Sequence, residues 1–122
     1  TVLEAIGLAL EMPEEHLAAV TGLSGSGPAF VYAMIEAMSD AGVYLGLPRK
    51  VAQALAAQTV CGAAKMVRET GEHPGRLKDK VTTPGGTTIE GLLALENAGL
   101  RAAIMKAVVA AGEKAQRLAE DA

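Results

Sequence analysis

The sequence predicts an all-α fold, a helical bundle formed by one domain. Half of its 122 residues are hydrophobic, yet only three are aromatic, and alanine and leucine dominate the apolar set. Alanine and leucine favour closely packed helices, whereas strands favour aromatic and β-branched residues. Apolar residues also recur at helical spacing, in segments bounded by glycine and proline.

Charge and cysteine content exclude several classes of protein. The formal net charge is −3 and there is no basic cluster, which argues against nucleic-acid binding. Cys61 is the only cysteine, so an internal disulfide is impossible and a cytoplasmic location is expected. No apolar run approaches the roughly 18 residues of a membrane span, so we expect no membrane association. His16 has no neighbours with metal-ligand spacing, and we expect no metal site.

The first segment, residues 1–12, predicts a short helix followed by a strand near 8–11, because Gly7 interrupts an otherwise apolar stretch. A helix over 13–20 should follow. Pro13 suits its first position, and two glutamates then occupy its first turn.

The glycine-rich stretch 21–27 does not match a dinucleotide-binding fingerprint. Phe30 stands where the third glycine should be, and no confident strand precedes the stretch. We expect instead a flexible segment leading into the next helix, which Ser24 or Ser26 can cap. Pro28 would then lie in the first turn of that helix.

The helix predicted over 28–45 carries more apolar surface than a monomer can cover. Its polar residues form only a narrow stripe of Glu36, Ser39 and Asp40. A surface helix normally has a polar face about as wide as its apolar one. We therefore expect a partner to cover this helix.

Gly46-Leu47-Pro48 should end that helix and start the next, which should run to about Thr70. Its apolar face consists of Val51, Leu55, Thr59, Gly62 and Met66, and it is flanked by Ala52, Ala56, Val60, Ala63 and Val67. A glycine in mid-helix costs about 1 kcal/mol relative to alanine, so a close helix crossing is expected at Gly62. Cys61 is interpreted as a small packing residue.

Glycines divide the remaining helices. Gly71 should end the long helix, 73–75 should form a sharp turn, and 76–80 should hold one short helical turn. A further helix should stop at Gly99, and the last should cover 100–120. The predicted buried stripe of this last helix consists of Leu100, Ile104, Val108, Ala111, Ala115 and Leu118. Glu113 and Arg117 are predicted to form an i,i+4 ion pair on the same helix.

The stretch 78–92 contains the most promising site. Its proline and two glycines precede Thr87 and Glu90, which have the spacing of a capping box, so a helix should begin there. The unpaired amides of a helix start carry partial positive charge. Together with the threonine hydroxyls they could bind a small anion such as a carboxylate. The alternative is a capped turn between two helices that binds nothing.

Five separated motifs occur in the order found in one enzyme family and cover nearly the whole chain. They are 21–29 (TGLSGSGPA), 46–48 (GLP), 73–75 (HPG), 77–79 (LKD) and 83–89 (TPGGTTI). In this combination the chain resembles pyrroline-5-carboxylate reductase, which reduces 1-pyrroline-5-carboxylate to L-proline with NADPH or NADH in the last step of proline biosynthesis.

The resemblance implies a division of the chain. Residues 1–12 would be the end of the family's Rossmann domain, and 13–122 its helical dimerisation and substrate-binding domain. No Gly-x-Gly-x-x-Gly motif opens a βαβ unit here. We therefore expect no cofactor bound to this chain and no activity from it alone. The family's helical half interlocks with a second copy, and such dimers often assemble into decamers.

The resemblance also implies the site residues. Thr88 matches the threonine that reaches the ring nitrogen of the imine, and is the expected catalytic residue. The loop that would hold the substrate carboxylate consists of Val81, Thr82, Thr83, Pro84, Gly85, Gly86, Thr87 and Thr88.

Two alternatives remain open. One is a non-catalytic helical oligomerisation module, in which the loop is only a turn. The other is a related dehydrogenase of the same architecture that acts on a different imine or hydroxy acid. Binding of proline or another five-membered ring acid at 81–88 separates the first alternative from the reductase, and substrate profiling separates the second.

Overall fold

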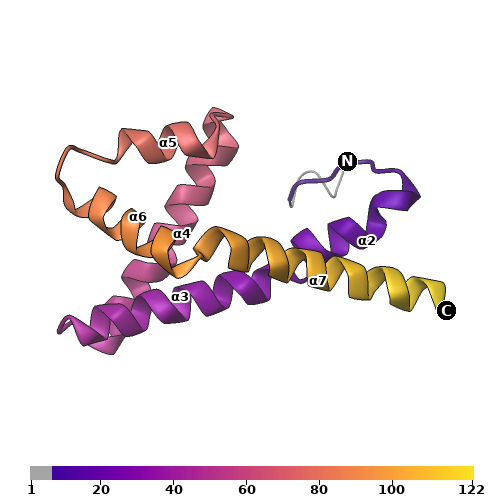
Figure 1. The fold of residues 1–122 in the computed structure, drawn as a ribbon, viewed down its shortest axis with the longest axis horizontal. Helices are drawn as coiled ribbons and strands as arrows, with labels where there is room; N and C mark the ends of the chain where they lie inside the picture. Colours follow the sequence, from indigo (N-terminus) through magenta and orange to yellow (C-terminus); the bar gives the residue numbers. More distant parts are fainter. Residues whose placement is uncertain (1–6) are drawn as a thin grey trace. The chain divides into compact units, whose positions relative to one another are not determined.

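The computed structural model describes residues 7–122, and every regular element in that range is a helix. The predicted all-α class is confirmed. The described residues form two compact units, one made of 7–28 with Met105–Ala122 and the other of Ala29–Ile104. Figure 1 shows the ribbon.

The strand expected near 8–11 is absent, because these residues have no regular secondary structure. A strand needs a second strand to satisfy its backbone groups, and the described part of the chain offers none. The short helix expected before it falls on residues 1–6, outside the described residues.

In the first unit, a single 3-10 turn, η1 (Glu14–His16), leads into α2 (Leu17–Val20) and then into a π-helical turn, η2 (Thr21–Gly25). The amide of Ser26 donates to the Thr21 carbonyl at 2.8 Å, which is the i→i+5 bond of a π-helix. The Ser24 hydroxyl donates backwards to the Val20 carbonyl at 2.9 Å. The expectation of a flexible, serine-capped segment is therefore wrong, because the backbone stays helical through it.

Glycine permits a close backbone approach between η2 and α7 (Leu100–Glu120) within this unit. A Cβ added at Gly22 would lie 2.6 Å from the Gly112 amide nitrogen and 2.7 Å from the Val108 carbonyl oxygen. Any side chain there would push the two segments apart. The π-helical turn thus holds a glycine against the last helix.

The face predicted for α7 is only partly correct. Val108, Ala111 and Ala115 are half-buried, whereas Ile104 and Leu118 are exposed. The ion pairs formed within residues 7–122 do not include one between Glu113 and Arg117. The nearby hydrogen bond runs instead from the Gln116 amide to the Glu120 carboxylate, at 3.0 Å.

The second unit contains the hairpin of α3 (Gly27–Tyr44), apart from its first two residues, and α4 (Arg49–Thr70), and the predicted bounds of both helices are confirmed. Gly46 has φ +104° and ends α3. Its amide donates to the Val43 carbonyl at 2.9 Å, and the Leu47 amide donates to the Gly42 carbonyl at 3.0 Å. This pair of bonds is the Schellman arrangement that stops a helix at glycine.

Small residues make the contact between α3 and α4. Ser39, Ala52 and Ala56 are 2%, 3% and 4% exposed, and a Cβ added at Gly42 would lie 3.0 Å from the Ala52 Cβ. The apolar face predicted for α4 packs within the chain only through its flanking alanines, Ala52 and Ala56. The members of that face with large side chains are all exposed: Val51, Leu55 and Met66.

Two details predicted for the middle of α4 are also wrong. A Cβ added at Gly62 would meet nothing within 4 Å, so no close crossing occurs there within residues 7–122. Cys61 is exposed and packs against no core.

Much apolar surface is left uncovered in the chain. Tyr32 and Tyr44 of α3 are 70% and 89% exposed. The helical run Glu14–Tyr44 is long and apolar enough to cross a membrane by length and composition, with 6% of its most apolar window buried. The expectation that no segment is long and apolar enough to span a membrane is therefore wrong. A core helix passes the same test, so this result alone does not indicate a membrane.

Three helices complete the second unit: α5 (Pro74–Lys80), α6 (Thr87–Ala98) and the first residues of α7. Gly71 and Gly99 end α4 and α6 with φ of +68° and +76°, as predicted. The turn expected at 73–75 is instead the start of α5. His73 caps that helix, because its Nδ1 accepts from the Gly75 amide at 3.0 Å.

Candidate functional site

The loop between α5 and α6 is built around a tight turn. The Gly86 amide donates to the Thr83 carbonyl at 3.0 Å, closing a four-residue turn. Pro84 occupies its second position, and Gly85 occupies the third with φ +69°. Proline followed by a residue of positive φ is the signature of a type II turn. The sequence Thr-Pro-Gly-Gly therefore sets the path of the chain into α6.

Helix α6 begins directly after the turn. Gly86 is its N-cap, with φ −82° and ψ 176°, and no side chain caps it. The predicted capping box is therefore wrong, because Thr87 is already the first helical residue and Glu90 cannot pair with it as a cap. The first amides of α6 have no intrahelical partner, so they remain available to an anion.

A substituent at Gly86 would crowd the loop. A Cβ there would collide with the Thr83 hydroxyl and lie 3.2 Å from the Thr83 carbonyl oxygen. Because Gly86 has no side chain, the turn can fold back on the start of α6. The backbone at Gly86 is therefore also accessible to a ligand.

The four threonine hydroxyls of the loop differ in their partners. Thr82 donates to the Asp79 carbonyl at 2.8 Å and thereby extends the end of α5. Thr87 and Thr88 are exposed. Among the hydrogen bonds formed within residues 7–122, none involves the hydroxyl of Thr83, Thr87 or Thr88.

An open groove of about 650 Å³ lies between α5, α6 and the start of α7. Ile89, Leu92 and Leu93 supply its apolar wall, and its charged residues are of both signs. Three residues of the predicted loop line this groove: Thr82, Gly85 and Gly86. The predicted residues that do not line it are Val81, Thr83, Pro84, Thr87 and Thr88.

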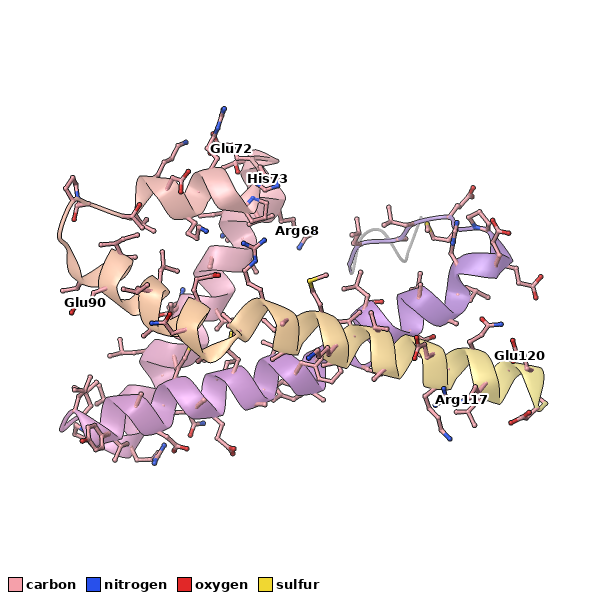
Figure 2. The ribbon with its side chains drawn as sticks, in the orientation of Figure 1. Arg68, Glu72, His73, Glu90, Arg117 and Glu120 are labelled. Carbon is pink, nitrogen blue, oxygen red and sulfur yellow. The ribbon has the colours of Figure 1, made fainter. Side chains whose placement is uncertain are left out.

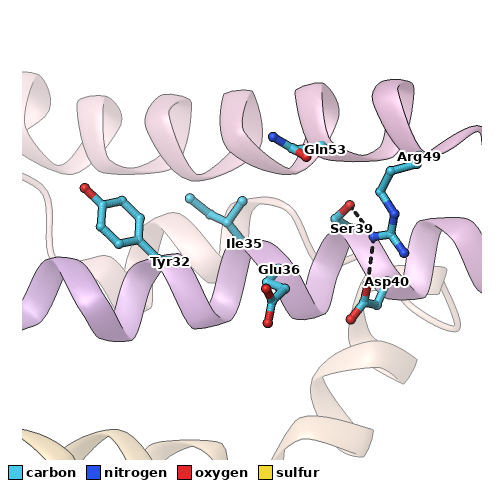
Figure 3. Close-up of a pocket in the computed structure, with 7 residues that line it drawn as sticks. All are labelled: Tyr32, Ile35, Glu36, Ser39, Asp40, Arg49 and Gln53. Atoms are coloured by element: carbon cyan, nitrogen blue, oxygen red, sulfur yellow. Dashed lines mark hydrogen bonds and ion pairs between the residues drawn. The ribbon is translucent and has the colours of Figure 1, made fainter.

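A second groove, of about 490 Å³, lies between α3 and α4 and was not foreseen from the sequence (Figure 3). Arg49 Nη1 donates to Ser39 Oγ at 2.9 Å and to Asp40 Oδ1 at 2.7 Å. Ser39 belongs to the narrow polar stripe of α3, and it is buried against α4. The sequence feature that could have indicated this contact is the short connection 45–48, which brings the end of one helix opposite the start of the next.

Gly85 gives a direct test of the turn. Gly85→Ala should destabilise the chain by about 1–2 kcal/mol, because an L-residue is strained at positive φ. Gly91→Ala is the matched control. Gly91 lies inside α6 with open space around a Cβ, so alanine there should stabilise by roughly 0.5–1 kcal/mol. Opposite shifts in thermal unfolding temperature are expected, and shifts of the same sign would contradict the type II turn.

Comparison with known proteins places these features in a family context. The model of the pyrroline-5-carboxylate reductase dimerisation family matches residues 14–118. A pyrroline-5-carboxylate reductase of Methanosarcina acetivorans is 58% identical over 117 residues, which are 96% of this chain and 43% of that protein. The Escherichia coli enzyme is 50% identical over 119 residues, with 98% and 44% covered. The chain thus spans less than half the length of these curated relatives.

Solved structures agree with the sequence relatives. A Plasmodium falciparum pyrroline carboxylate reductase with NADP bound superposes with a TM-score of 0.86 at 40% identity, covering 91% of this chain and 45% of that one. A Coxiella burnetii pyrroline-5-carboxylate reductase gives a TM-score of 0.88 at 40% identity, covering 93% and 43%.

Proposed function

Because the chain belongs to the pyrroline-5-carboxylate reductase family, we propose that the full-length protein reduces 1-pyrroline-5-carboxylate to L-proline with NADPH or NADH. This chain supplies dimerisation and the loop for the substrate carboxylate. The match of the dimerisation-domain model over residues 14–118 carries the proposal. The type II turn and the uncapped start of α6 support the role of the loop.

The loop 81–88 binds the substrate carboxylate in this proposal. The first amides of α6 point out of the helix start, where the helix dipole also favours negative charge. Gly85 and Gly86 carry no side chains that would keep a ligand away from the backbone. A carboxylate can therefore accept hydrogen bonds from these amides, with threonine hydroxyls as further donors.

Thr88 orients the reacting imine. Reduced nicotinamide, bound outside this chain, would supply the hydride to the imine carbon. The Thr88 hydroxyl has no partner within residues 7–122 and is exposed in the first turn of α6, the same turn that carries the carboxylate-binding amides. The protonated ring nitrogen donates its N–H to the Thr88 hydroxyl oxygen, and this hydrogen bond fixes the ring and holds that proton in place. The chain's own contribution is thus orientation and electrostatics.

The uncovered apolar faces of α3 and α4 fit a second copy of the chain. The family model that matches is named for dimerisation, and a buried partner surface explains why Tyr32 and Val51 are exposed in one chain. Assembly of dimers into a decamer and a cytoplasmic location complete the proposal. The membrane-length run Glu14–Tyr44 then serves as an interface helix.

Two measurements test the proposed function. The full-length protein should oxidise NADPH or NADH in the presence of 1-pyrroline-5-carboxylate and produce proline. The chain of residues 1–122 alone should show no such reduction and no dinucleotide binding in titration calorimetry, because 21–25 forms a π-helical turn rather than a nucleotide-binding loop. Turnover of a different imine or hydroxy acid only would indicate the related dehydrogenase, and tight dinucleotide binding to 1–122 would contradict the division of roles.

A further inference from the structure

An ion pair between Glu72 and Lys80 spans the whole length of α5. Lys80, the last residue of this helix, donates from Nζ to Glu72 Oε1 at 2.9 Å and to Oε2 at 2.8 Å. Glu72 lies before the helix start, at the junction of α4 and α5 where Figure 2 labels it beside His73. The pair therefore joins the two ends of α5, eight residues apart in sequence.

Glu72 is itself tied to the end of α4. Its backbone amide donates to the Thr70 hydroxyl at 3.2 Å, and that hydroxyl donates to the Met66 carbonyl at 2.6 Å. His73 caps the start of α5 through the Gly75 amide at 3.0 Å. The carboxylate that holds Lys80 is thus carried by a segment with fixed bonds to both helices.

The other side of Lys80 leads directly into the loop. The Val81 amide donates to the Lys78 carbonyl at 3.2 Å, and the Thr82 amide and hydroxyl donate to the Asp79 carbonyl at 3.2 and 2.8 Å. The first two loop residues therefore continue the last turn of α5. A change in the direction of α5 would move the loop 81–88 with it.

We propose that Glu72 and Lys80 are positioning residues, which hold the loop 81–88 at the place where it receives the substrate carboxylate. The inference rests on the proposed function of the loop. The ion pair of Glu72 and Lys80 differs from an ordinary surface pair in its geometry. Both carboxylate oxygens of Glu72 accept from Lys80, and the Glu72 side chain is only 29% exposed. Lys65 and Glu69 on α4, by contrast, stand 3.9 Å apart with side chains 67% and 65% exposed.

The test is steady-state kinetics of full-length variants. Lys80→Met and Glu72→Gln should each raise KM for 1-pyrroline-5-carboxylate by about threefold to fivefold, the upper range for one exposed or half-exposed ion pair. The KM for the dinucleotide and kcat should change little, because neither residue touches the reacting atoms. Lys80→Arg keeps the positive charge and should keep the wild-type KM. The exchanged pair Glu72→Lys with Lys80→Glu should restore most of the loss.

The control is Lys65→Met, which removes the exposed ion pair on α4 and should leave the substrate KM unchanged. Equal KM values for wild type, Lys80→Met and Glu72→Gln would overturn the inference, as would failure of the exchanged pair to recover. If one single variant is too unstable to assay, the other single variant and the exchanged pair decide between the two outcomes. Absence of pyrroline-5-carboxylate reduction in the wild type would instead refute the proposed function, and so the two failures are distinguishable.

Discussion

Replacing Thr88 by valine in the full-length protein is expected to lower kcat/KM for 1-pyrroline-5-carboxylate by roughly ten- to 150-fold. Valine keeps the β-branched shape and nearly the volume of threonine but removes the hydroxyl. A hydrogen bond to a charged or polar partner is worth about 1.5–3 kcal/mol, which gives this range of rate loss. The affinity for the dinucleotide should be unaffected.

The stability of the variant should remain close to wild type. Thr88 is exposed and caps nothing, since Gly86 is the N-cap of α6. Thr59→Val is a matched control, because the Thr59 hydroxyl on α4 only donates to the Leu55 carbonyl at 2.7 Å. Kinetics and thermal unfolding of both variants separate a lost substrate contact from a folding defect. Normal turnover by Thr88→Val would remove Thr88 from the site.

The structure also changes the expectation for Thr87. A capping box would make Thr87→Val destabilising by about 1 kcal/mol. Thr87 is instead the first helical residue, and no side chain caps α6. A sequence pattern of Thr-x-x-Glu does not say which of two adjacent residues leaves the helical conformation. Here Gly86 takes the extended conformation, so the pattern predicted the helix but placed its cap one residue late.

Helix ends were largely predictable because they depend on local chemistry. Gly46, Gly71 and Gly99 each take positive φ at the end of a helix, a conformation that favours glycine over every other residue. Pro84 and Gly85 define a turn by the same kind of local preference. These positions need no knowledge of the rest of the fold.

Burial was predicted less well, because it depends on contacts between helices. Hydrophobicity pointed to Val51 and Leu55 as the packed face of α4, but the hairpin packs through Ala52 and Ser39. Large apolar residues and small ones lie on adjacent faces of this helix. Which face meets a neighbour inside the chain, and which is left for a partner, is not encoded in helical periodicity.

The candidate site shows the same division. The turn and the helix start follow from local sequence. The ion pair of Glu72 with Lys80 does not, since it depends on how the junction of α4 and α5 places Glu72 relative to the last turn of α5. Likewise, the bond from Arg49 to Ser39 required the hairpin geometry.

A glutamate at Ala33 or Ala37 of α3 is expected to dissociate or unfold the assembled protein. Both alanines are exposed in the single chain, and the exposed Tyr32 lies on the same helix. If a second copy covers this face, each substitution buries an unpaired charge in both subunits. An uncompensated buried charge costs about 3–5 kcal/mol. The dissociation constant should then rise by a factor on the order of 100 or more.

Sedimentation equilibrium of the 122-residue chain provides the measurement. The wild type should remain a dimer at micromolar concentration, and Ala33→Glu and Ala37→Glu should sediment as monomers or unfold. Ala119→Glu, in the last turn of α7, is the control and should leave assembly unchanged, since Ala119 is exposed near the end of the chain. A wild-type monomer would refute dimerisation through this domain. A wild-type dimer that survives both α3 substitutions would place the interface elsewhere, and the exposed apolar surface of α3 would then need a different partner.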